Sequence, residues 1–195
     1  MGDFLPGERL IEEKISLELQ VSRSPIREAI RMLEKDGLLF VNSSGGVTII
    51  QPTIEDYKYL YECRVEMEPL AAYYAAIRRT PEQLKIIRSS LQRMEEIAKA
   101  NNIRKVHDKN VNFHEPIVEA SANRFLISMV LQIRGVNSFY RKSILDVDPL
   151  HVAEAMYEHQ QIFQAIEEQD AIKAKQLMKT HIKNDYILFL KSLQL

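Results

Sequence analysis

Three histidines in the second half of the sequence lie inside stripes of apolar residues at helical spacing. They are His114, His159 and His181, and each belongs to a different predicted helix. A buried imidazole needs a hydrogen-bond partner or a metal ion. A single buried histidine usually finds such a hydrogen-bond partner and is then an ordinary core residue. Three such residues on separate helices favour a shared site, and imidazole is a common ligand of divalent transition metals. We therefore predict a metal centre.

The fourth donor is predicted to be Asn110, which lies one helical turn before His114 on the same face. Three imidazoles and an amide oxygen suit zinc first, with nickel, manganese or iron(II) as alternatives, and they leave positions open for water or a ligand. His107 shares this face and is an alternative donor, although a surface role is the simpler interpretation. His151 is expected at the surface.

Arg64 lies in another apolar stripe, and a buried guanidinium needs an anion beside it. Two anions are possible partners of Arg64: Glu68, one turn further along, or the carboxylate of a bound effector that also contacts the metal. Asn137 is a weaker candidate for the same pocket, with an ordinary polar position in a helical bundle as the alternative. A metal held by neutral ligands keeps its positive charge, so the expected effector is a small organic acid.

A second set of candidate residues lies near the N-terminus, where Arg23, Arg27 and Arg31 recur at steps of four. Arginines at this spacing can simply form a solvated helix face paired with Glu28, Glu34 or other acids. The order of predicted elements favours another interpretation: a helix over residues 10–19, a tight turn, the arginine helix and a glycine-tipped hairpin over 38–50. In such a winged helix-turn-helix the second helix enters the major groove of DNA, so the arginines are expected to line the groove. The side opposite these arginines is apolar and is expected to face inward: Ile26, Ile30 and Leu33.

The composition is that of an ordinary globular protein of 195 residues, 46% hydrophobic and 27% charged. The start MGDFLPGERLIEEK lacks the apolar run of a secretory signal, and no stretch approaches the roughly 18 apolar residues of a membrane span. A cytoplasmic protein with no membrane partner is therefore expected. The single cysteine, Cys63, excludes an internal disulfide and a cysteine-rich zinc site.

The charge distribution gives no general preference for nucleic acid. The net charge is −1, and residues 1–50 carry six Lys/Arg against eight Asp/Glu. Contact with DNA would therefore depend on where individual arginines lie rather than on a basic block.

A change of composition near residues 51–53 divides the chain in two. Five of the six glycines precede it, and the sequence after it is helical throughout. Helix starts are predicted at Thr53, Thr80, Asp148 and Asp170, with breaks near 101–102 and 121–123. The expectation is a mainly α protein, with a helix-turn-helix domain over 1–51 and a bundle of about six helices over 52–195.

Both halves resemble known domains. The segment "PGERLIEEKISLELQVSRSPIREAIRMLEKDGLL", together with the hairpin tip "NSSGGVTI", closely resembles the winged-helix domain of GntR-type transcription regulators. The segments "YECRVEMEPLAAYYAA", "NVNFHEPIVEASANRFL" and "EHQQIFQAIEEQDAIKAKQLMKTHI" resemble the all-helical ligand-binding domain called FCD, found in the FadR-like branch. The family normally has a further helix upstream of "GDFLPGERL". Without this helix Leu10, Ile26 and Ile30 are expected to be uncovered. Two explanations are open: the sequence is trimmed at its start, or the first domain is loosely packed.

The resemblance implies roles for individual residues. Metal-containing FCD domains place a carboxylate and three histidines at the positions of Asn110, His114, His159 and His181, so the amide at Asn110 is a departure. Arg64 is similarly placed near the pocket. An arginine often precedes the wing glycine of the family, whereas Gly45 stands there in this chain. The positions that match family contacts to operator DNA are Arg9, Ser22, Arg23, Ser24, Arg27 and Gly46.

The function predicted from these patterns is transcription regulation, expected to be repression. The protein would bind a two-fold operator as a homodimer and respond to a small organic acid at the metal. One alternative is a dimeric ligand-binding or interaction protein with impaired DNA binding. A helical-bundle metalloenzyme is a further alternative, disfavoured because the histidine stripes hold no carboxylate placed as a general base apart from Glu68.

Overall fold

The computed structural model of the chain describes residues 4–99, 112–144 and 149–192. Contacts group these residues into two compact units. The first holds the residues up to Tyr57 together with Arg134–Ile144, and the second holds the remaining described residues. The domain boundary predicted between residues 51 and 52 follows the sequence break and stays a prediction.

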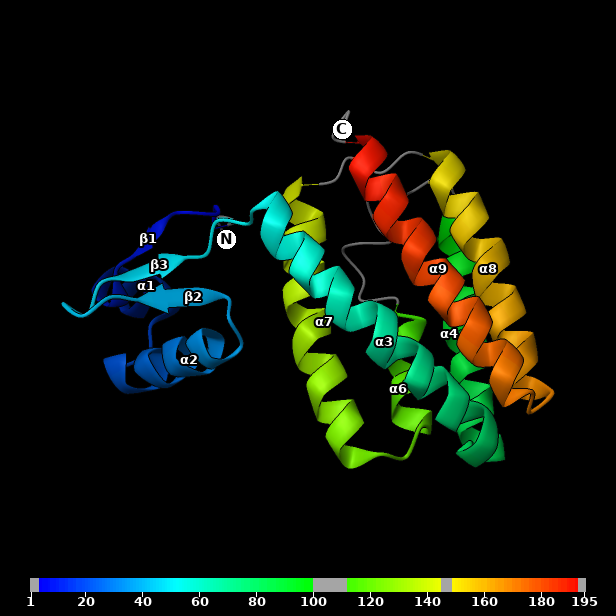
Figure 1. The fold of residues 1–195 in the computed structure, drawn as a ribbon. Coiled ribbons are helices and arrows are strands. Elements are labelled where there is room, and N and C mark those ends of the chain that lie inside the picture. Colours follow the sequence, from blue (N-terminus) through cyan, green and yellow to red (C-terminus); the bar gives the residue numbers. More distant parts are fainter. Residues whose placement is uncertain (1–3, 100–111, 145–148, 193–195) are drawn as a thin grey trace. The chain divides into compact units, whose positions relative to one another are not determined.

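The N-terminal unit is a helix-turn-helix followed by a hairpin, with one additional short strand (Figure 1). Strands β1, β3 and β2 form an antiparallel sheet in that order, and Leu10 of β1 pairs with Val47 of β3. The hairpin was expected, but residues 9–10 were not expected to form a strand: a two-residue strand has no readable period, and its pairing is long-range. The elements are β1 (Arg9–Leu10), α1 (Glu12–Leu19), α2 (Arg23–Lys35), β2 (Leu39–Val41) and β3 (Val47–Ile49).

This sheet supplies the core of the N-terminal unit. Ile26 and Ile30 of α2 are each 7% exposed, because Leu39, Val47 and Ile49 pack against them. The expectation that both isoleucines would be uncovered is therefore wrong. Leu10 is partly buried at the edge of the same cluster.

Leu33 is a second correction in this unit. It was expected to face inward with Ile26 and Ile30, but it is 38% exposed. The buried cluster includes Ile30 and does not include Leu33, one turn further along α2. The apolar stripe of this helix is therefore longer than the surface that the sheet covers.

The described residues that follow the hairpin are helical apart from short connections, and they form six helices, as expected (Figure 1). The predicted starts that the structure describes carry caps: Thr53 Oγ1 accepts from the Asp56 amide at 3.1 Å, and Asp170 Oδ1 accepts from the Lys173 amide at 3.0 Å. The predicted start at Asp148 and the predicted break near 101–102 lie outside the described residues. Thr80 and Gln83 form a reciprocal capping box, with contacts of 2.9 and 3.2 Å. The helices are α3 (Ile54–Arg78), α4 (Pro81–Lys99), α6 (His114–Ala120), α7 (Arg124–Ile144), α8 (Pro149–Glu167) and α9 (Ala171–Ser192).

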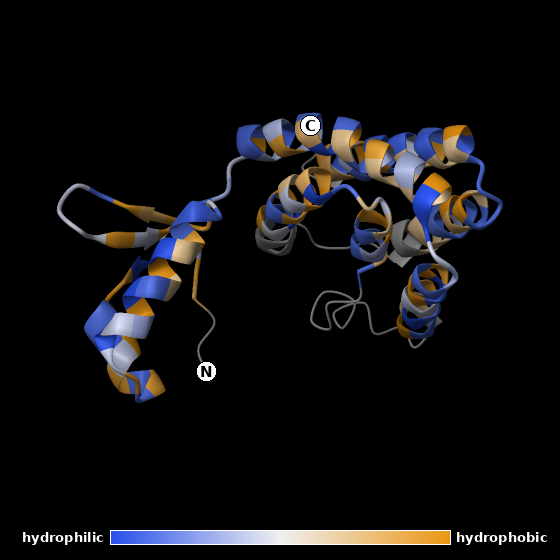
Figure 2. Cartoon of the chain, turned by 90° about the horizontal axis from the view of Figure 1, so that it is seen from below, coloured by the Kyte–Doolittle hydropathy of each residue, from blue (hydrophilic) through white to orange (hydrophobic). Residues whose placement is uncertain are grey.

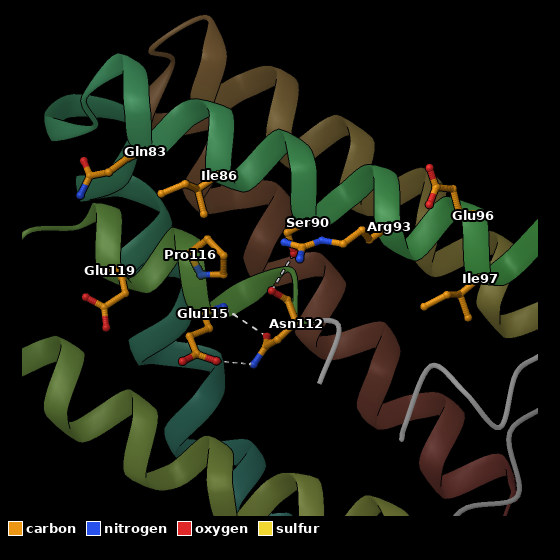
Figure 3. A pocket seen from close by; sticks show the side chains of 10 residues that line it. All are labelled: Gln83, Ile86, Ser90, Arg93, Glu96, Ile97, Asn112, Glu115, Pro116 and Glu119. Atoms are coloured by element: carbon orange, nitrogen blue, oxygen red, sulfur yellow. Dashed lines mark hydrogen bonds between the residues drawn. The ribbon is translucent and has the colours of Figure 1, made fainter. Parts of the chain in front are cut away.

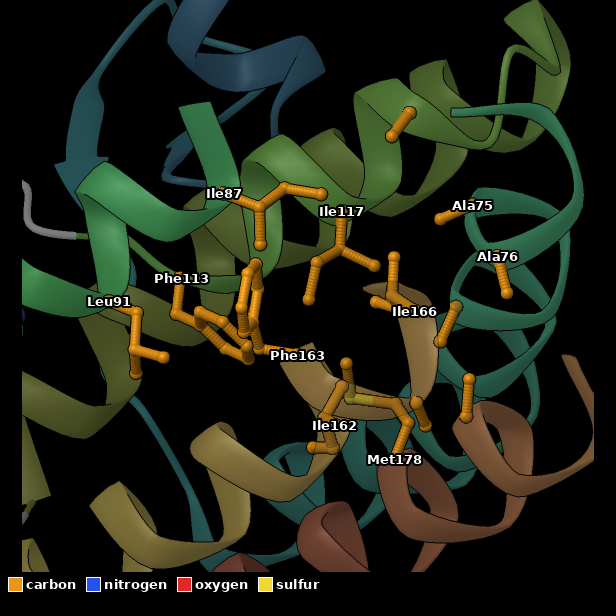
Figure 4. Close-up of a cluster of buried hydrophobic side chains, with 14 of the residues drawn as sticks. Ala75, Ala76, Ile87, Leu91, Phe113, Ile117, Ile162, Phe163, Ile166 and Met178 are labelled. Carbon is orange, nitrogen blue, oxygen red and sulfur yellow. The ribbon is translucent and has the colours of Figure 1, made fainter. Parts of the chain in front are cut away.

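The core of the second unit is built from one face of each of several helices. Figure 4 shows Ile87 of α4, Phe113, Ile117 of α6 and Met178 of α9 directed into one cluster, with Ala75 where α3 approaches closely. Helices α8 and α9 pack side by side along their length. Helices across the chain carry both hydrophilic and hydrophobic residues, as amphipathic helices do (Figure 2). Among the described residues, none of the helices is both long and apolar enough to cross a membrane.

Candidate metal centre and nucleic-acid interface

The three predicted histidines meet at one point in the second unit. His114 is the first residue of α6, His159 lies in α8 and His181 lies in α9. They are 8%, 4% and 5% exposed. The Nε2 atom of His181 lies 3.2 Å from Nε2 of His159 and 3.2 Å from Nε2 of His114. Two consecutive helices, α8 and α9, and the more distant α6 thus bring three imidazole nitrogens together.

These separations fit ligands around one ion. Zinc–nitrogen bonds of 2.0–2.1 Å at tetrahedral angles place neighbouring nitrogens about 3.3 Å apart. A ring nitrogen of each histidine lies within 4.8 Å of the others, and all three side chains are buried. The cluster can therefore act as three facing ligands of a divalent metal.

Two carboxylates fix the orientation of two of the imidazoles, those of His114 and His181. Glu68 Oε2 lies 2.7 Å from Nδ1 of His114, and Glu158 Oε2 lies 2.6 Å from Nδ1 of His181. A carboxylate accepts hydrogen bonds, so we assign the proton of each ring to Nδ1, which leaves a lone pair on Nε2. Two lone pairs that face each other at 3.2 Å repel, and a cation between them removes that repulsion. This carboxylate–histidine arrangement is the usual support of a metal-bound imidazole.

Arg64 belongs to the same network. Its Nε donates to Glu68 Oε1 at 2.7 Å, and its Nη1 donates to Asp185 Oδ2 at 3.2 Å. Arg64 is 4% exposed and Glu68 is 1% exposed, so the charges are paired away from water. Of the two anions that the sequence left open for Arg64, the structure shows Glu68. Contact of Arg64 with an effector stays a prediction.

Sequence reasoning missed Glu158, Asn184 and Asp185. Asn184 Nδ2 donates to Glu158 Oε1 at 2.5 Å and so holds that carboxylate against His181. Burial raises the pKa of Glu158, but the hydrogen bonds from His181 and Asn184 outweigh it, so the pKa is lowered. Asn184 and Asp185 follow His181 by three and four residues, which was a signal, although polar residues at this spacing are usually solvated.

Several predicted residues are not placed at this centre. Asn110 and His107 lie outside the described residues, as does the side chain of His151. Asn137 is buried, 4% exposed, in the part of α7 that groups with the first unit. The proposed roles of Asn110 and Asn137 therefore stay predictions.

A groove between α4 and α6 is a separate feature (Figure 3). It encloses about 690 Å³, and α6 contributes Glu115, Pro116 and Glu119 to it. Asn112 lies at its wall, where its backbone oxygen accepts from Ser90 Oγ at 2.8 Å. The lining side chains include acids, a base and apolar residues, and half of them are exposed, so they select no ligand class.

The predicted DNA-contacting side chains of the N-terminal unit are exposed. Arg23, Arg27 and Arg31 follow one another along α2 and are exposed, as are Ser22, at the N-cap position, and Ser24. Arg9 is exposed in β1. This is the arrangement expected of a recognition helix, and DNA contact by these residues stays a prediction.

Two of these arginines are paired, but with acids other than Glu28 and Glu34. Arg27 Nε lies 2.8 Å from Glu12 Oε2, and Arg23 Nη2 lies 2.8 Å from Glu13 Oε1. Both acids come from the first turn of α1.

The hairpin tip gives a structural reason for glycine at position 46. Its amide donates to Asn42 Oδ1 at 2.7 Å, which closes the tip of the hairpin. A Cβ atom at this position would lie 2.8 Å from Asn42 Nδ2, so the Asn42 side chain would have to move away from the amide that it accepts from. The neighbouring Gly45 has φ of +80°, which also favours glycine. Contact of Gly46 with DNA stays a prediction.

Known protein families match both parts of the chain. The family described as "Bacterial regulatory proteins, gntR family" matches residues 1–49, and the FCD domain matches residues 59–184. YdhC of Bacillus subtilis, an HTH-type transcriptional regulator, is 34% identical over 186 residues, which are 94% of this chain and 82% of that protein.

Solved structures show the same fold. Escherichia coli McbR/YncC aligns with a TM-score of 0.81 at 19% identity and covers 96% of this chain and 89% of its own. A solved FCD domain described as metal-free aligns with a TM-score of 0.55 at 22% identity, over 73% of this chain and 98% of its own.

Proposed function

Because the chain belongs to the gntR family of bacterial regulatory proteins and carries an FCD domain, it is a DNA-binding transcription regulator, and we propose that it is a repressor controlled by a small organic acid bound at a metal ion. The family and its relatives are regulators, not enzymes. The observation that carries the proposal is the convergence of three buried histidines, in which Nε2 of His181 lies 3.2 Å from Nε2 of both His114 and His159.

The three histidines would hold the metal through Nε2, with Asn110 as a fourth ligand. Zinc is the first expectation, and nickel or manganese are alternatives. When bound, the ion would supply a positive charge and open coordination positions. The relative described as a metal-free FCD domain agrees with a fold that can take up a metal.

The effector class follows from the charges around the centre. A divalent ion bound by neutral ligands attracts an anion, and a carboxylate oxygen can fill an open position. Glu68 and Glu158 behind the histidines offset part of that charge, so a monoanion or dianion is sufficient. Arg64 would assist by exchanging Asp185, its longer contact at 3.2 Å, for the carboxylate of the effector. Asn137 is the remaining proposed contact.

The DNA-binding half would act through α2 and the hairpin. We propose that residues 1–51 bind DNA and that residues 52–195 bind the effector and form a homodimer. Two copies would present α2 to the half-sites of a two-fold operator. The effector would shift the population of dimers whose half-site spacing matches the operator.

The test uses a DNA duplex that the full chain itself selects from a randomised pool. Binding to this duplex is measured by mobility shift with zinc-loaded and chelator-treated protein, with and without each member of a panel of mono-, di- and tricarboxylic acids. We expect at least one acid to release DNA from the zinc-loaded protein only. Release that is equal without metal would contradict the metal pocket. A failure to select any sequence would favour the alternative, an interaction protein without DNA binding.

A further inference from the structure

The two glutamates at the start of α1 contact the arginines of α2 at different atoms. Glu12 approaches Arg27 at Nε, whereas Glu13 approaches Arg23 at the terminal nitrogen Nη2. Both distances are 2.8 Å. All four side chains lie on the unit that carries the proposed DNA interface.

The hydrogen bond between Arg27 and Glu12 is made at Nε and so does not use the terminal nitrogens of the guanidinium. End-on recognition of a guanine uses the two terminal nitrogens, which donate to O6 and N7 of the base. A carboxylate at Nε therefore holds the side chain without occupying these two donors. Glu12 is suited to this because its side chain is only 28% exposed, compared with 66% for Glu13.

The contact at Nη2 has the opposite consequence for Arg23. A phosphate or base that binds the end of this guanidinium competes with Glu13 for the same nitrogen. Both side chains are more than half exposed, so the pair is weak and exchangeable. When DNA binds, the Glu13 carboxylate is left close to the phosphate backbone and repels it.

We infer that Glu12 is a positioning residue that aims Arg27 at a base edge, whereas Glu13 competes with DNA for Arg23. The inference rests on the proposed DNA interface. It gives two adjacent acids of one helical turn different roles: Glu12 raises the preference for the operator over other DNA, and Glu13 lowers affinity for all DNA.

The two roles predict different changes in DNA affinity when each glutamate is replaced by the neutral glutamine. Glu13→Gln should tighten binding to operator and unrelated DNA by the same factor, about two- to fivefold, because an exposed pair of this kind has that strength. Glu12→Gln should tighten binding to unrelated DNA through the lost negative charge but should not tighten operator binding. Its ratio of operator to unrelated affinity should fall about two- to fivefold.

The experiment compares two duplexes at fixed salt by fluorescence anisotropy with the full chain. One is the duplex that the wild type selects from a randomised pool, and the other is a shuffled duplex of the same composition. Glu18→Gln is the matched control, because it removes an exposed acid from the same helix. Glu12→Gln is also measured in an Arg27→Ala background, where its effect on the ratio should vanish. Thermal melting of each variant should match the wild type.

The outcomes separate this inference from the proposed interface. If Arg27→Ala leaves operator binding unchanged, the proposed interface is wrong. If Arg27→Ala weakens operator binding while Glu12→Gln changes the ratio no more than Glu18→Gln does, the interface stands and the positioning role is overturned. If Glu13→Gln binds both duplexes no more tightly than Glu18→Gln does, the competing role is overturned.

Discussion

Replacing Glu68 with glutamine should destabilise the second unit and weaken its affinity for metal. The carboxylate is 1% exposed and accepts two hydrogen bonds, from Arg64 Nε and from His114 Nδ1, both at 2.7 Å. Glutamine offers one oxygen and one amino group, so one of the two contacts would set a donor against a donor. The Arg64 charge would also lose its nearest buried counter-charge.

The size of the effect follows from these contacts. Removing one partner of a buried ion pair costs about 3–5 kcal/mol of unfolding free energy. Arg64 keeps Asp185 Oδ2 at 3.2 Å, so we expect the lower end, about 3 kcal/mol, in metal-free protein. Loss of the carboxylate behind a metal-bound histidine should also weaken zinc binding about 10- to 100-fold.

The assay is urea denaturation followed by far-ultraviolet circular dichroism, with chelator present, together with calorimetric titration of zinc. Glu66→Gln is the matched control, since Glu66 lies on the same helix as Glu68 but makes an exposed pair, with Lys179 of α9 at 2.6 Å. An exposed pair should cost less than about 1 kcal/mol. If Glu68→Gln unfolds within 1 kcal/mol of Glu66→Gln, or binds zinc as tightly as the wild type, the role given to Glu68 is wrong.

Three further outcomes are expected. Arg27→Ala should cost about 1–3 kcal/mol of binding free energy to the selected duplex, whereas Arg31→Ala should weaken binding to all sequences alike. Equilibrium titrations measure both variants. An unchanged affinity of Arg27→Ala for the selected duplex would contradict the assignment of Arg27 to a base edge. Asn110→Asp should tighten zinc binding in calorimetry, because a carboxylate replaces a neutral donor, and unaltered affinity would remove residue 110 from the ligand set. The hydrogen bond from Lys179 lowers the pKa of Glu66, so its contribution to stability is present above the ordinary carboxyl pKa and lost as pH falls through the lowered pKa. Denaturation curves of wild type and Glu66→Gln should therefore converge in acid, and a constant difference would argue against this linkage.

The burial of the histidines could be predicted, but their distances could not. His114, His159 and His181 each interrupt an apolar stripe, and a residue in such a stripe faces the core against which its helix packs. Their separation of 3.2 Å depends on how α6, α8 and α9 pack, which no local pattern contains.

The carboxylates of the network show the same limit. Glu68 could be found because it follows Arg64 by one turn in the same helix. Glu158 could not, because it precedes His159 in the chain and instead contacts His181 of the neighbouring helix. In the N-terminal unit, strand β1 escaped prediction because its Arg9–Thr48 and Leu10–Val47 pairs join residues far apart in sequence.

Metal content of the purified full chain tests the metal centre most directly. Wild type and His159→Ala are incubated separately with zinc, nickel and manganese, dialysed, and measured by elemental analysis, with circular dichroism to confirm that the variant is folded. We predict one tightly held ion per wild-type chain and none in His159→Ala. If the wild type retains no stoichiometric ion after any of the three incubations, the histidines are core residues or direct effector contacts, and the metal-dependent response proposed for this regulator is wrong.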